Sequence, residues 1–440
     1  MRYLVTFFCL FSCILATNAQ DIKRPDSYNY TRGVEAIQQE NFKEALEYLN
    51  KEVDENPKNG YAFAWLAFIY NTHNEYGKAL TASDKAVKLV PKKDKEYRSF
   101  ALNVHAQIYV NLEKPDNALK DYAQSIKENP DESDTYKYRA QLYYEKEEYD
   151  LSDNDYKQMI RLDQGDVMGY MGLGRNANAQ GKYTQAIEHY DYVIKLAPEY
   201  SSGYSFRGEC FLRQGKYNEA ATDIVKALDI DNNNKAFYHM QELADSSITS
   251  IATKLRVQAS KDPTEGSWPY YLGIVYEHRD NYNKAVGYYK DALKLDNNPI
   301  IEKRISNCYE ELGNYQEALK YIDMAIQTDS TDADFVRIRA LINDAAGNTK
   351  ESIADWDKYI VLDPESYFGY YRRGWVKDHT GDTEGALEDY TTSIELEPRY
   401  TYGYINRGVL YKLVGETQLA RKDFEEVITR DSLHAERPTI

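Results

Sequence analysis

The chain has 440 residues and a formal net charge of -17, with 54 Lys and Arg against 71 Asp and Glu. This acidity argues against nucleic acid as a partner, because phosphate binding needs clustered cations and no long basic run occurs. Hydrophobic residues make up 42% of the chain and charged residues 28%, which is typical of a folded protein and not of a disordered one.

Residues 1–19 differ from the rest and are typical of a secretory signal peptide. Arg2 precedes an apolar run over 3–16, and small residues follow up to Ala19. Cleavage after Ala19 predicts an exported protein, which we expect in the periplasm of a bacterial cell envelope. A secreted or a lipid-anchored protein is the alternative, since the residues before Cys13 resemble a lipobox. No other stretch of 18 apolar residues occurs, so we expect no transmembrane span in the mature chain.

From residue 24 onward the chain repeats itself at a fixed interval. Segments that end a helix recur twelve times, often at a Pro, and eight of the eleven intervals between them are equal, at about 34 residues. Within a unit, a Gly ends a first helix, a small residue lets a second helix approach it, and the Pro ends the second helix. Each unit is therefore predicted to be an antiparallel helical hairpin. The turn glycines are Gly181, Gly215, Gly313, Gly347, Gly381 and Gly415.

This pattern resembles the tetratricopeptide repeat (TPR) family over residues 24–432. One unit carries most of the family pattern, in Tyr170, Leu173, Gly174, Ala186, Tyr190 and Pro198. The resemblance implies an all-α, superhelical solenoid of about twelve hairpins, one of them degenerate, whose first helices line a concave groove. Because the family's motif residues are packing residues, it also implies a binding fold and not an enzyme.

Two regular arrays are predicted on either side of an irregular unit. We expect about six repeats in 20–232 and about five in 264–432, followed by a short tail, 433–440. The unit between them, 233–263, is shorter than a regular unit and lacks the turn Gly. We interpret it as a degenerate repeat or a joint. The third unit has five extra residues around 91–98, which predict either a longer loop or an extended first helix.

Aromatic residues at the groove positions of the first helices are candidate anchors for a partner segment. The strongest candidate is the cluster of Phe368, Tyr371, Trp375 and Tyr402, which comes from two adjacent units. Packing against a neighbouring helix is the alternative for any of these residues. The full set is Tyr61, Phe68, Phe100, Tyr144, Tyr270, Phe368, Tyr371, Trp375 and Tyr402.

The same positions of the second array hold a row of carboxylates, with His278 and His379 beside it. Such a row favours a protein or peptide partner with a basic segment, although a solvated acidic face is the alternative. We expect no metal and no cofactor, because no HxxxH or CxxC spacing occurs. No GxSxG, HExxH or phosphate-binding Gly loop is present, so we expect no enzyme. The acidic row is Glu277, Glu310, Glu311, Asp344 and Asp378.

These features predict a non-catalytic protein-interaction scaffold of the cell envelope that captures a partner segment in a concave groove. One alternative is a glycan or small-molecule receptor that stacks its ligand on the groove aromatics, and another is a structural homo-oligomeric spacer. The last helix should leave Ala420, Phe424, Val427 and Ile428 on a partly open face. This face predicts a homodimer through the C-terminal end or docking of a partner.

Two further predictions concern pairs of side chains. Cys210 and Cys308 share one repeat position three units apart, so we expect two free thiols. In five units an Arg eight residues before the turn accompanies an Asp eight residues after it, and an antiparallel hairpin places the two at the same level. We expect ion pairs that fix the register of the hairpin. The pairs are Arg139–Asp155, Arg207–Asp223, Arg339–Asp355, Arg373–Asp389 and Arg407–Asp423.

Overall fold

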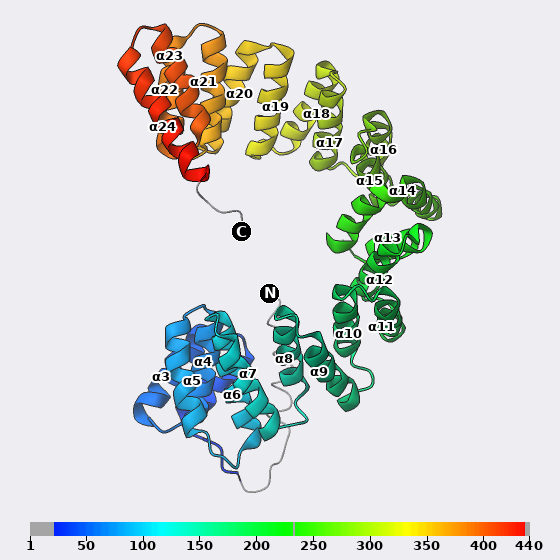
Figure 1. Ribbon diagram of the computed structural model, residues 1–440, viewed down its shortest axis with the longest axis vertical. Helices are drawn as coiled ribbons and strands as arrows, with labels where there is room; N and C mark the ends of the chain where they lie inside the picture. The colour runs from blue at the N-terminus through cyan, green and yellow to red at the C-terminus, as the bar shows by residue number, and fades with distance from the viewer. Residues whose placement is uncertain (1–21, 232–233, 436–440) are drawn as a thin grey trace. The chain divides into compact units, whose positions relative to one another are not determined.

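The computed structural model describes residues 22–231 and 234–435, which form 23 α-helices and no strand. The predicted all-α fold of helical hairpins is confirmed (Figure 1). The chain divides into two compact arrays, Met1–Ala236 and Phe237–Ile440, which we call the first and the second array. The predicted signal peptide, 1–19, lies outside the described residues.

The first array contains six hairpins, each made of a first and a second helix that pack antiparallel. In chain order their bounds are α2 Tyr28–Gln38, α3 Phe42–Glu55, α4 Gly60–Thr72, α5 Tyr76–Leu89, α6 Lys95–Asn111, α7 Pro115–Glu128, α8 Ser133–Glu145, α9 Tyr149–Leu162, α10 Val167–Ala179, α11 Tyr183–Leu196, α12 Ser201–Arg213 and α13 Tyr217–Ile230.

The irregular unit forms α14, Asn234–Lys261, whose backbone leaves the helical conformation at Ser247 (φ -159°, ψ 82°). Five regular hairpins follow. Their bounds are α15 Ser267–Glu277, α16 Tyr282–Leu295, α17 Pro299–Glu311, α18 Tyr315–Thr328, α19 Ala333–Ala346, α20 Thr349–Leu362, α21 Tyr367–His379, α22 Thr383–Leu396, α23 Thr401–Leu413 and α24 Thr417–Ala435. The predicted tail, 433–440, therefore begins as the end of α24 and not as a loop.

One residue in the left-handed conformation joins the two helices of every regular hairpin. All six predicted glycines have positive φ, from 70° to 86°. The other five turns adopt the same conformation without Gly, although it costs an L-residue roughly 1–2 kcal/mol. The sequence pattern missed them because they carry ordinary side chains. They are Glu40, Asn74, Glu113, Glu147 and Asp280, with φ from 54° to 61°.

Four of the five extra residues of the third unit extend its first helix, from the 13 residues of a regular unit to 17, and this outcome favours the extended helix over the longer loop. Helix α6 has 17 residues, and the Asp94 side chain accepts a hydrogen bond from the Tyr97 amide at its start, 3.2 Å away. Asp94 is fully buried and also accepts from Arg24 Nε at 3.0 Å. The longer helix thus binds the segment that precedes α2.

The core follows the seams between helices, where aromatic residues of the second helices lie on glycines of the first. Tyr289 of α16 is fully buried, and a Cβ atom on Gly273 of α15 would lie only 2.3 Å from its ring. A side chain at position 273 would therefore push the two helices apart. In the first array the largest buried side chain is Trp65, whose ring centroid lies 4.5 Å from that of Phe100.

All five predicted Arg–Asp pairs are confirmed. Each guanidinium donates at least two hydrogen bonds to its carboxylate, with nitrogen–oxygen distances of 2.5–3.1 Å. The Asp side chains are only 4–7% exposed. The hydrogen bonds that Arg373 donates to Asp389 raise the pKa of Arg373 above its usual range, against the opposing effect of burial. Planar, bidentate pairing of this kind fixes one register of the two helices.

Four of these arginines, Arg207, Arg339, Arg373 and Arg407, also link successive hairpins, which the sequence did not predict. Arg339 donates to Asp323 of the preceding unit at 2.7 Å, and Arg373 donates to Asp357 at 2.6 Å. In the third unit His105 occupies the place of the Arg, with ring nitrogens 2.9 Å from Asp121 and 3.3 Å from Asp84. The pairs therefore hold neighbouring repeats together as well as the two helices of one repeat.

The two predicted thiols are free. Cys210 lies in the first array and Cys308 in the second, and both side chains are buried. Burial raises the pKa of each thiol to about 12. Neither group is poised for thiolate chemistry, because the thiolate is the reactive form.

Candidate functional site

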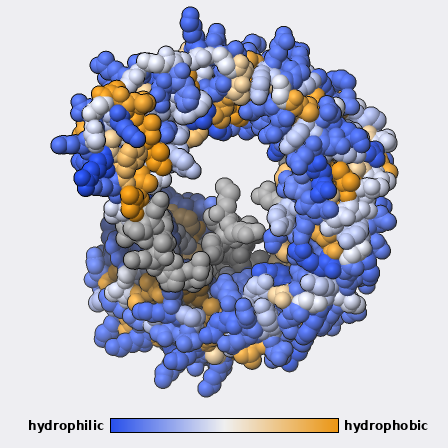
Figure 2. Space-filling view, turned by 45° about the horizontal axis from the view of Figure 1, so that its top comes forward, coloured by the Kyte–Doolittle hydropathy of each residue, from blue (hydrophilic) through white to orange (hydrophobic). Residues whose placement is uncertain are grey.

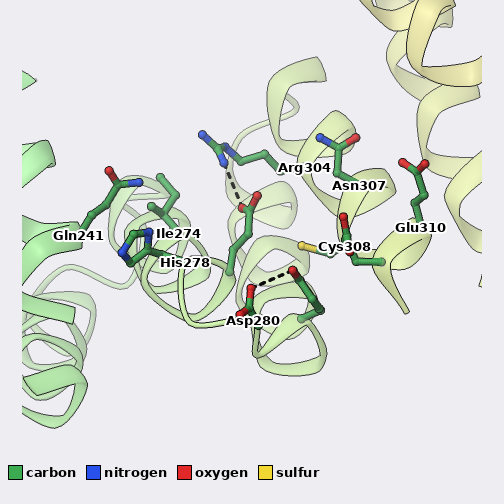
Figure 3. Close-up of a pocket in the computed structure, with 11 residues that line it drawn as sticks. Gln241, Ile274, His278, Asp280, Arg304, Asn307, Cys308 and Glu310 are labelled. Carbon is green, nitrogen blue, oxygen red and sulfur yellow. Dashed lines mark hydrogen bonds and ion pairs between the residues drawn. The ribbon is translucent and has the colours of Figure 1, made fainter. Parts of the chain in front are cut away.

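The second array contains a cavity of about 530 Å³ at the groove positions of α15 and α17 (Figure 3). Predicted members of the acidic row line it, namely Glu277 from α15 and the pair Glu310 and Glu311 from α17. Figure 3 shows Arg304 directed toward a carboxylate across the cavity, which changes the charge that a ligand would meet.

Glu277 is not a free carboxylate. Its Oε2 atom accepts a hydrogen bond from Arg304 Nη1 at 3.0 Å and a short one from the Tyr289 hydroxyl. Arg304 Nε also donates to the hydroxyl of Tyr270, one of the predicted anchors, at 3.2 Å. The Arg comes from the next hairpin, so the row is neutralised at this point by a contact between repeats.

Asp344 of α19 is neutralised in the same way. Arg372 of α21 donates to Asp344 Oδ2 at 2.5 Å, Ser352 donates to its other oxygen, and the Asp344 side chain is only 4% exposed. Two of the five members of the predicted acidic row, Glu277 and Asp344, are therefore ion-paired within the protein and do not offer a free carboxylate to a partner. Burying a carboxylate without such a partner would be costly, which explains the pairing.

The remaining members of the row are Glu310, Glu311 and Asp378, none of which forms an ion pair with another described residue. The residues equivalent to Arg304 and Arg372 in the following repeats are Ile338 and Asn406, which carry no charge. Burial, and next the charge of Glu311, raises the pKa of Glu310. These three carboxylates are the part of the row that can meet a cationic ligand.

The two histidines beside the row are occupied within the protein. His278 Nε2 lies 3.1 Å from Asp245 of α14, and His379 Nδ1 lies 2.8 Å from the Trp375 carbonyl. Within the described ranges, no three His, Cys, Asp or Glu side chains come close enough together to hold a metal ion.

The predicted anchors of the first array differ in exposure. Tyr61 and Phe100 are buried; the Tyr61 hydroxyl donates to Asp94 at 3.1 Å, and Phe100 packs on Trp65. These two are packing residues, as the alternative interpretation of the groove aromatics had it. Phe68 is half-buried at the edge of a cavity described below. Tyr144 is half-buried, with the Arg175 guanidinium 4.9 Å above its ring.

The predicted aromatic cluster of the second array is only partly accessible, because Phe368 also packs on the buried Trp356, with ring centroids 5.9 Å apart. Phe368, Tyr371 and Trp375 are half-buried on α21, and Tyr402 of α23 is 58% exposed. Tyr400 joins the cluster, with its ring centroid 5.0 Å from that of Tyr371 and 5.7 Å from that of Tyr402. Sequence reasoning missed Tyr400 because it precedes α23, outside the groove positions of the first helix. Tyr200, which occupies the same point of its unit directly before α12, was the available signal.

The predicted open face of α24 is present in part. Ile428 is 68% exposed, but Ala420 is buried at 3%, because α24 packs on α23 along that side. Leu413 of α23 and Val414 after it, at the turn end of the hairpin, are also 74% and 51% exposed. Figure 2 shows hydrophobic residues gathered over this last hairpin.

Comparison with known proteins agrees with this architecture. Sequence models of the tetratricopeptide repeat match residues 30–94, 103–166, 171–235, 271–299, 304–332 and 369–400. No curated protein matches the chain. Within the described part, no helix is long and apolar enough to cross a membrane.

Three solved structures illustrate the likeness. A C-terminal part of a TPR protein from Cytophaga hutchinsonii is 17% identical, with a TM-score of 0.44 over 61% of this chain and 95% of its own. A TPR protein from Parabacteroides merdae is also 17% identical (TM-score 0.42, 64% and 97% coverage), and MamA from Desulfovibrio magneticus is 15% identical (TM-score 0.36, 38% and 95%). The repeat matches, together with the hairpins and their turns, show that this chain belongs to the tetratricopeptide repeat family.

Proposed function

We propose that the protein is a non-catalytic scaffold of the cell envelope, exported by the segment 1–19, that holds a basic segment of a protein partner. The TPR fold supports the general role, because its repeats present rigid surfaces and their shared residues serve packing. Export to the periplasm is part of the proposal and rests on the sequence of the segment 1–19.

One helical stripe of α21 carries the proposal. Phe368, Tyr371, Trp375 and Asp378 follow one another at intervals of three or four residues, which places them on one face of the helix. The aromatic rings offer apolar contact to a partner. Asp378, at the end of the stripe, offers an unpaired carboxylate to a Lys or Arg. The combination fits a segment in which basic and apolar residues alternate.

Glu310 and Glu311 extend the negative charge two repeats away from Asp378. Because the intervening Asp344 is neutralised by Arg372, the charges form separate sites along the groove and not one field. A partner would then need basic residues at a matching separation, which favours an extended segment of defined spacing over any cationic surface.

A pull-down from envelope extracts with cross-linking and mass spectrometry tests this function. We expect the wild-type chain to capture a partner that Trp375→Ala and Asp378→Asn fail to retain. Leu396→Ala and Glu395→Gln, both exposed on the second helix α22, are matched controls that should keep it. A partner retained by all four variants would contradict the stripe as the binding surface.

The apolar surface of the last hairpin favours a second role, association of two chains through their C-terminal ends. Leu413 and Ile428 are among the most exposed large hydrophobic residues of the protein. Sedimentation of the wild-type chain should show a dimer that Ile428→Glu converts to a monomer. A wild-type chain that sediments as a monomer at high micromolar concentration would exclude this role.

A further inference from the structure

The first array contains a second cavity, of about 480 Å³, whose chemistry differs from that of the acidic groove. Its walls come mainly from α4, α6 and α8, the first helices of three consecutive hairpins, so it lies at groove positions. A volume of this size is within the range of pockets that enclose a small ligand.

Carboxamide side chains dominate the polar part of this wall. A carboxamide donates and accepts hydrogen bonds in one plane, so it can hold two neighbouring polar atoms of a ligand. Asn71 and Asn111 bond each other, with Nδ2 to Oδ1 at 2.9 Å, and each retains a further polar atom. No other described residue bonds the amide of Gln107 or Gln141. The six carboxamides are Asn71, Asn74, Asn103, Gln107, Asn111 and Gln141.

Asn103, in the same wall, holds one buried polar atom that has no hydrogen-bond partner within the described residues. The residue is 2% exposed and its Nδ2 donates to Thr135 Oγ1 at 2.7 Å, yet its buried Oδ1 has no hydrogen-bond partner among the described residues. Turning the amide over would exchange the two roles and still leave one polar atom without a partner. A buried polar atom of this kind is destabilising unless a ligand or a water supplies the bond.

The apolar part of the wall is aromatic and held in place. Phe100 packs 4.5 Å from Trp65, and Phe68 lies at 6.3 Å from the same indole, so both rings have defined positions. Tyr138 of α8 adds another ring. The half-buried rings of Phe68 and Tyr138 can contact apolar C–H faces of a ligand while the carboxamides bind its polar groups.

Charge excludes several ligand classes. Glu145 alone among the lining residues carries a charge, and no Lys, Arg or His lines the cavity. An anionic ligand would find no cation here, and a strongly cationic one would find a single carboxylate at the rim. The ligand that fits is uncharged, rich in groups that both donate and accept, and apolar on its faces.

We propose that this cavity binds a neutral saccharide. Sugar hydroxyls both donate and accept, and a ring presents several of them within the reach of adjacent carboxamides. A peptide backbone offers only one donor and one acceptor in about 3.3 Å of chain, which is fewer polar groups than the six clustered carboxamides could bind. The site is independent of the protein-binding role proposed for α21.

Calorimetric titration of the full-length mature chain tests the assignment. The probes are neutral di- and trisaccharides of glucose, galactose and N-acetylglucosamine. We expect at least one to bind, with affinity unchanged between 50 and 500 mM NaCl because the ligand is uncharged. The double variant Gln107→Ala, Gln141→Ala should weaken binding at least tenfold, as should Phe68→Ala.

Gln185→Ala is the matched control, since Gln185 is exposed on the second helix α11 outside the cavity, and it should bind as the wild type does. The double variant changes two accessible side chains and should leave the circular dichroism melt unaltered, so it remains informative if Phe68→Ala fails to fold. No binding of any probe at millimolar concentration would overturn the proposal. So would binding that the double variant retains, or saturation of the cavity by an uncharged peptide in place of the sugars.

Discussion

The hairpins α4–α7 and α19–α24 differ in the side chains that hold neighbouring hairpins together. We call these contacts the apolar seam in α4–α7 and the ionic seam in α19–α24. In α4–α7, Trp65, Phe100 and Tyr97 pack ring against ring between neighbouring hairpins. In α19–α24, each of the three hairpins has an arginine that binds an Asp of its own hairpin. The same arginine also donates a hydrogen bond to a residue of the preceding hairpin. Each region also contains the other kind of contact: His105 lies beside Asp84 and Asp121 in α4–α7, and Trp356 packs on Phe368 in α19–α24. One repeat fold therefore combines apolar and ionic contacts in different proportions.

The two kinds of contact place different requirements on the geometry and charge of the side chains. Apolar burial is non-directional and tolerates small shifts, whereas a bidentate ion pair works only at one register. An ionic seam also requires every buried carboxylate to keep its cation, because desolvation offsets much of the attraction. We expect the two regions to respond differently to substitution.

The largest effect is expected in the apolar seam. Trp65→Ala should destabilise the first array by about 4 kcal/mol, because it removes a fully buried indole and leaves a cavity. Urea unfolding followed by circular dichroism measures the loss, and hydrogen exchange should locate it in α4–α7. Tyr192→Ala, at a half-exposed ring on α11, is the control and should change stability by less than about 0.5 kcal/mol.

Loss of one buried carboxylate should lower the stability of the ionic seam. Asp389→Ala removes the acceptor of Arg373 and of Lys377, whose Nζ lies 2.9 Å away, and leaves two cations partly buried. We expect a loss of about 3 kcal/mol in urea unfolding. Glu425→Gln breaks the exposed pair with Arg421 and should have an effect below about 1 kcal/mol. Equal, small effects of both variants would show that the seam is not held by its ion pairs.

Glu132, between α7 and α8, differs from the paired carboxylates because the folded protein disfavours its charged form. Burial, and next the charge of Asp134, raises its pKa to about 6 from 4.5. A carboxyl with a raised folded-state pKa contributes stability only while protonated, so stability falls as the pH rises from about 4.5 through 6.

Glu132→Gln should therefore stabilise the protein by about 1–2 kcal/mol at pH 7.5 and leave it unchanged at pH 4. Unfolding curves of the two proteins at both pH values check the sign. Glu128→Gln is a useful comparison, because hydrogen bonds from Gln124 and Arg98 outweigh burial and lower the pKa of Glu128, so its loss should destabilise at pH 7.5.

Binding should be pH-dependent in the groove of the second array. Because the pKa of Glu310 is raised, that carboxyl protonates at a higher pH than an ordinary Glu. We expect affinity for a Lys-rich probe peptide to fall on acidification and Glu310→Gln to flatten the profile, by calorimetry from pH 7.5 to 4.5. A profile unaltered by the substitution would remove Glu310 from the proposed site.

The smallest effects concern the turns, where the two arrays also differ. Glu113→Gly removes the strain of a non-Gly residue in the left-handed conformation and should stabilise the protein by about 0.5 kcal/mol. Gly381→Ala introduces the same strain, at φ 85°, and should destabilise the protein by about 1 kcal/mol. Gly77→Ala, inside α5 with open space around a Cβ, is the control and should stabilise. Thermal melts of the three variants rank them.

Much of the fold followed from periodicity within one repeat. The hairpins, the six glycine turns and the five Arg–Asp pairs each depend on spacings shorter than a single repeat, which the sequence displays directly. The extended α6 was one of two readings of the same five residues, and capping of its first turn by Asp94 accompanies the longer helix.

Less of the candidate site could be predicted, because it depends on contacts between repeats. Arg304 and Arg372 reach back 27 and 28 residues to neutralise Glu277 and Asp344. Groove periodicity alone could not show that Phe100 would be buried against Trp65 while Phe68 remained accessible.

The sequence by itself determined the family, the repeat register and the pairing across each hairpin, since all three arise from a local and repeated pattern. Only the tertiary structure decided which carboxylates stay free, which aromatic rings remain exposed, and where carboxamides converge on a cavity. Those properties depend on how one helix lies on the next, where burial and pairing are set by neighbours that the spacing within a repeat does not specify.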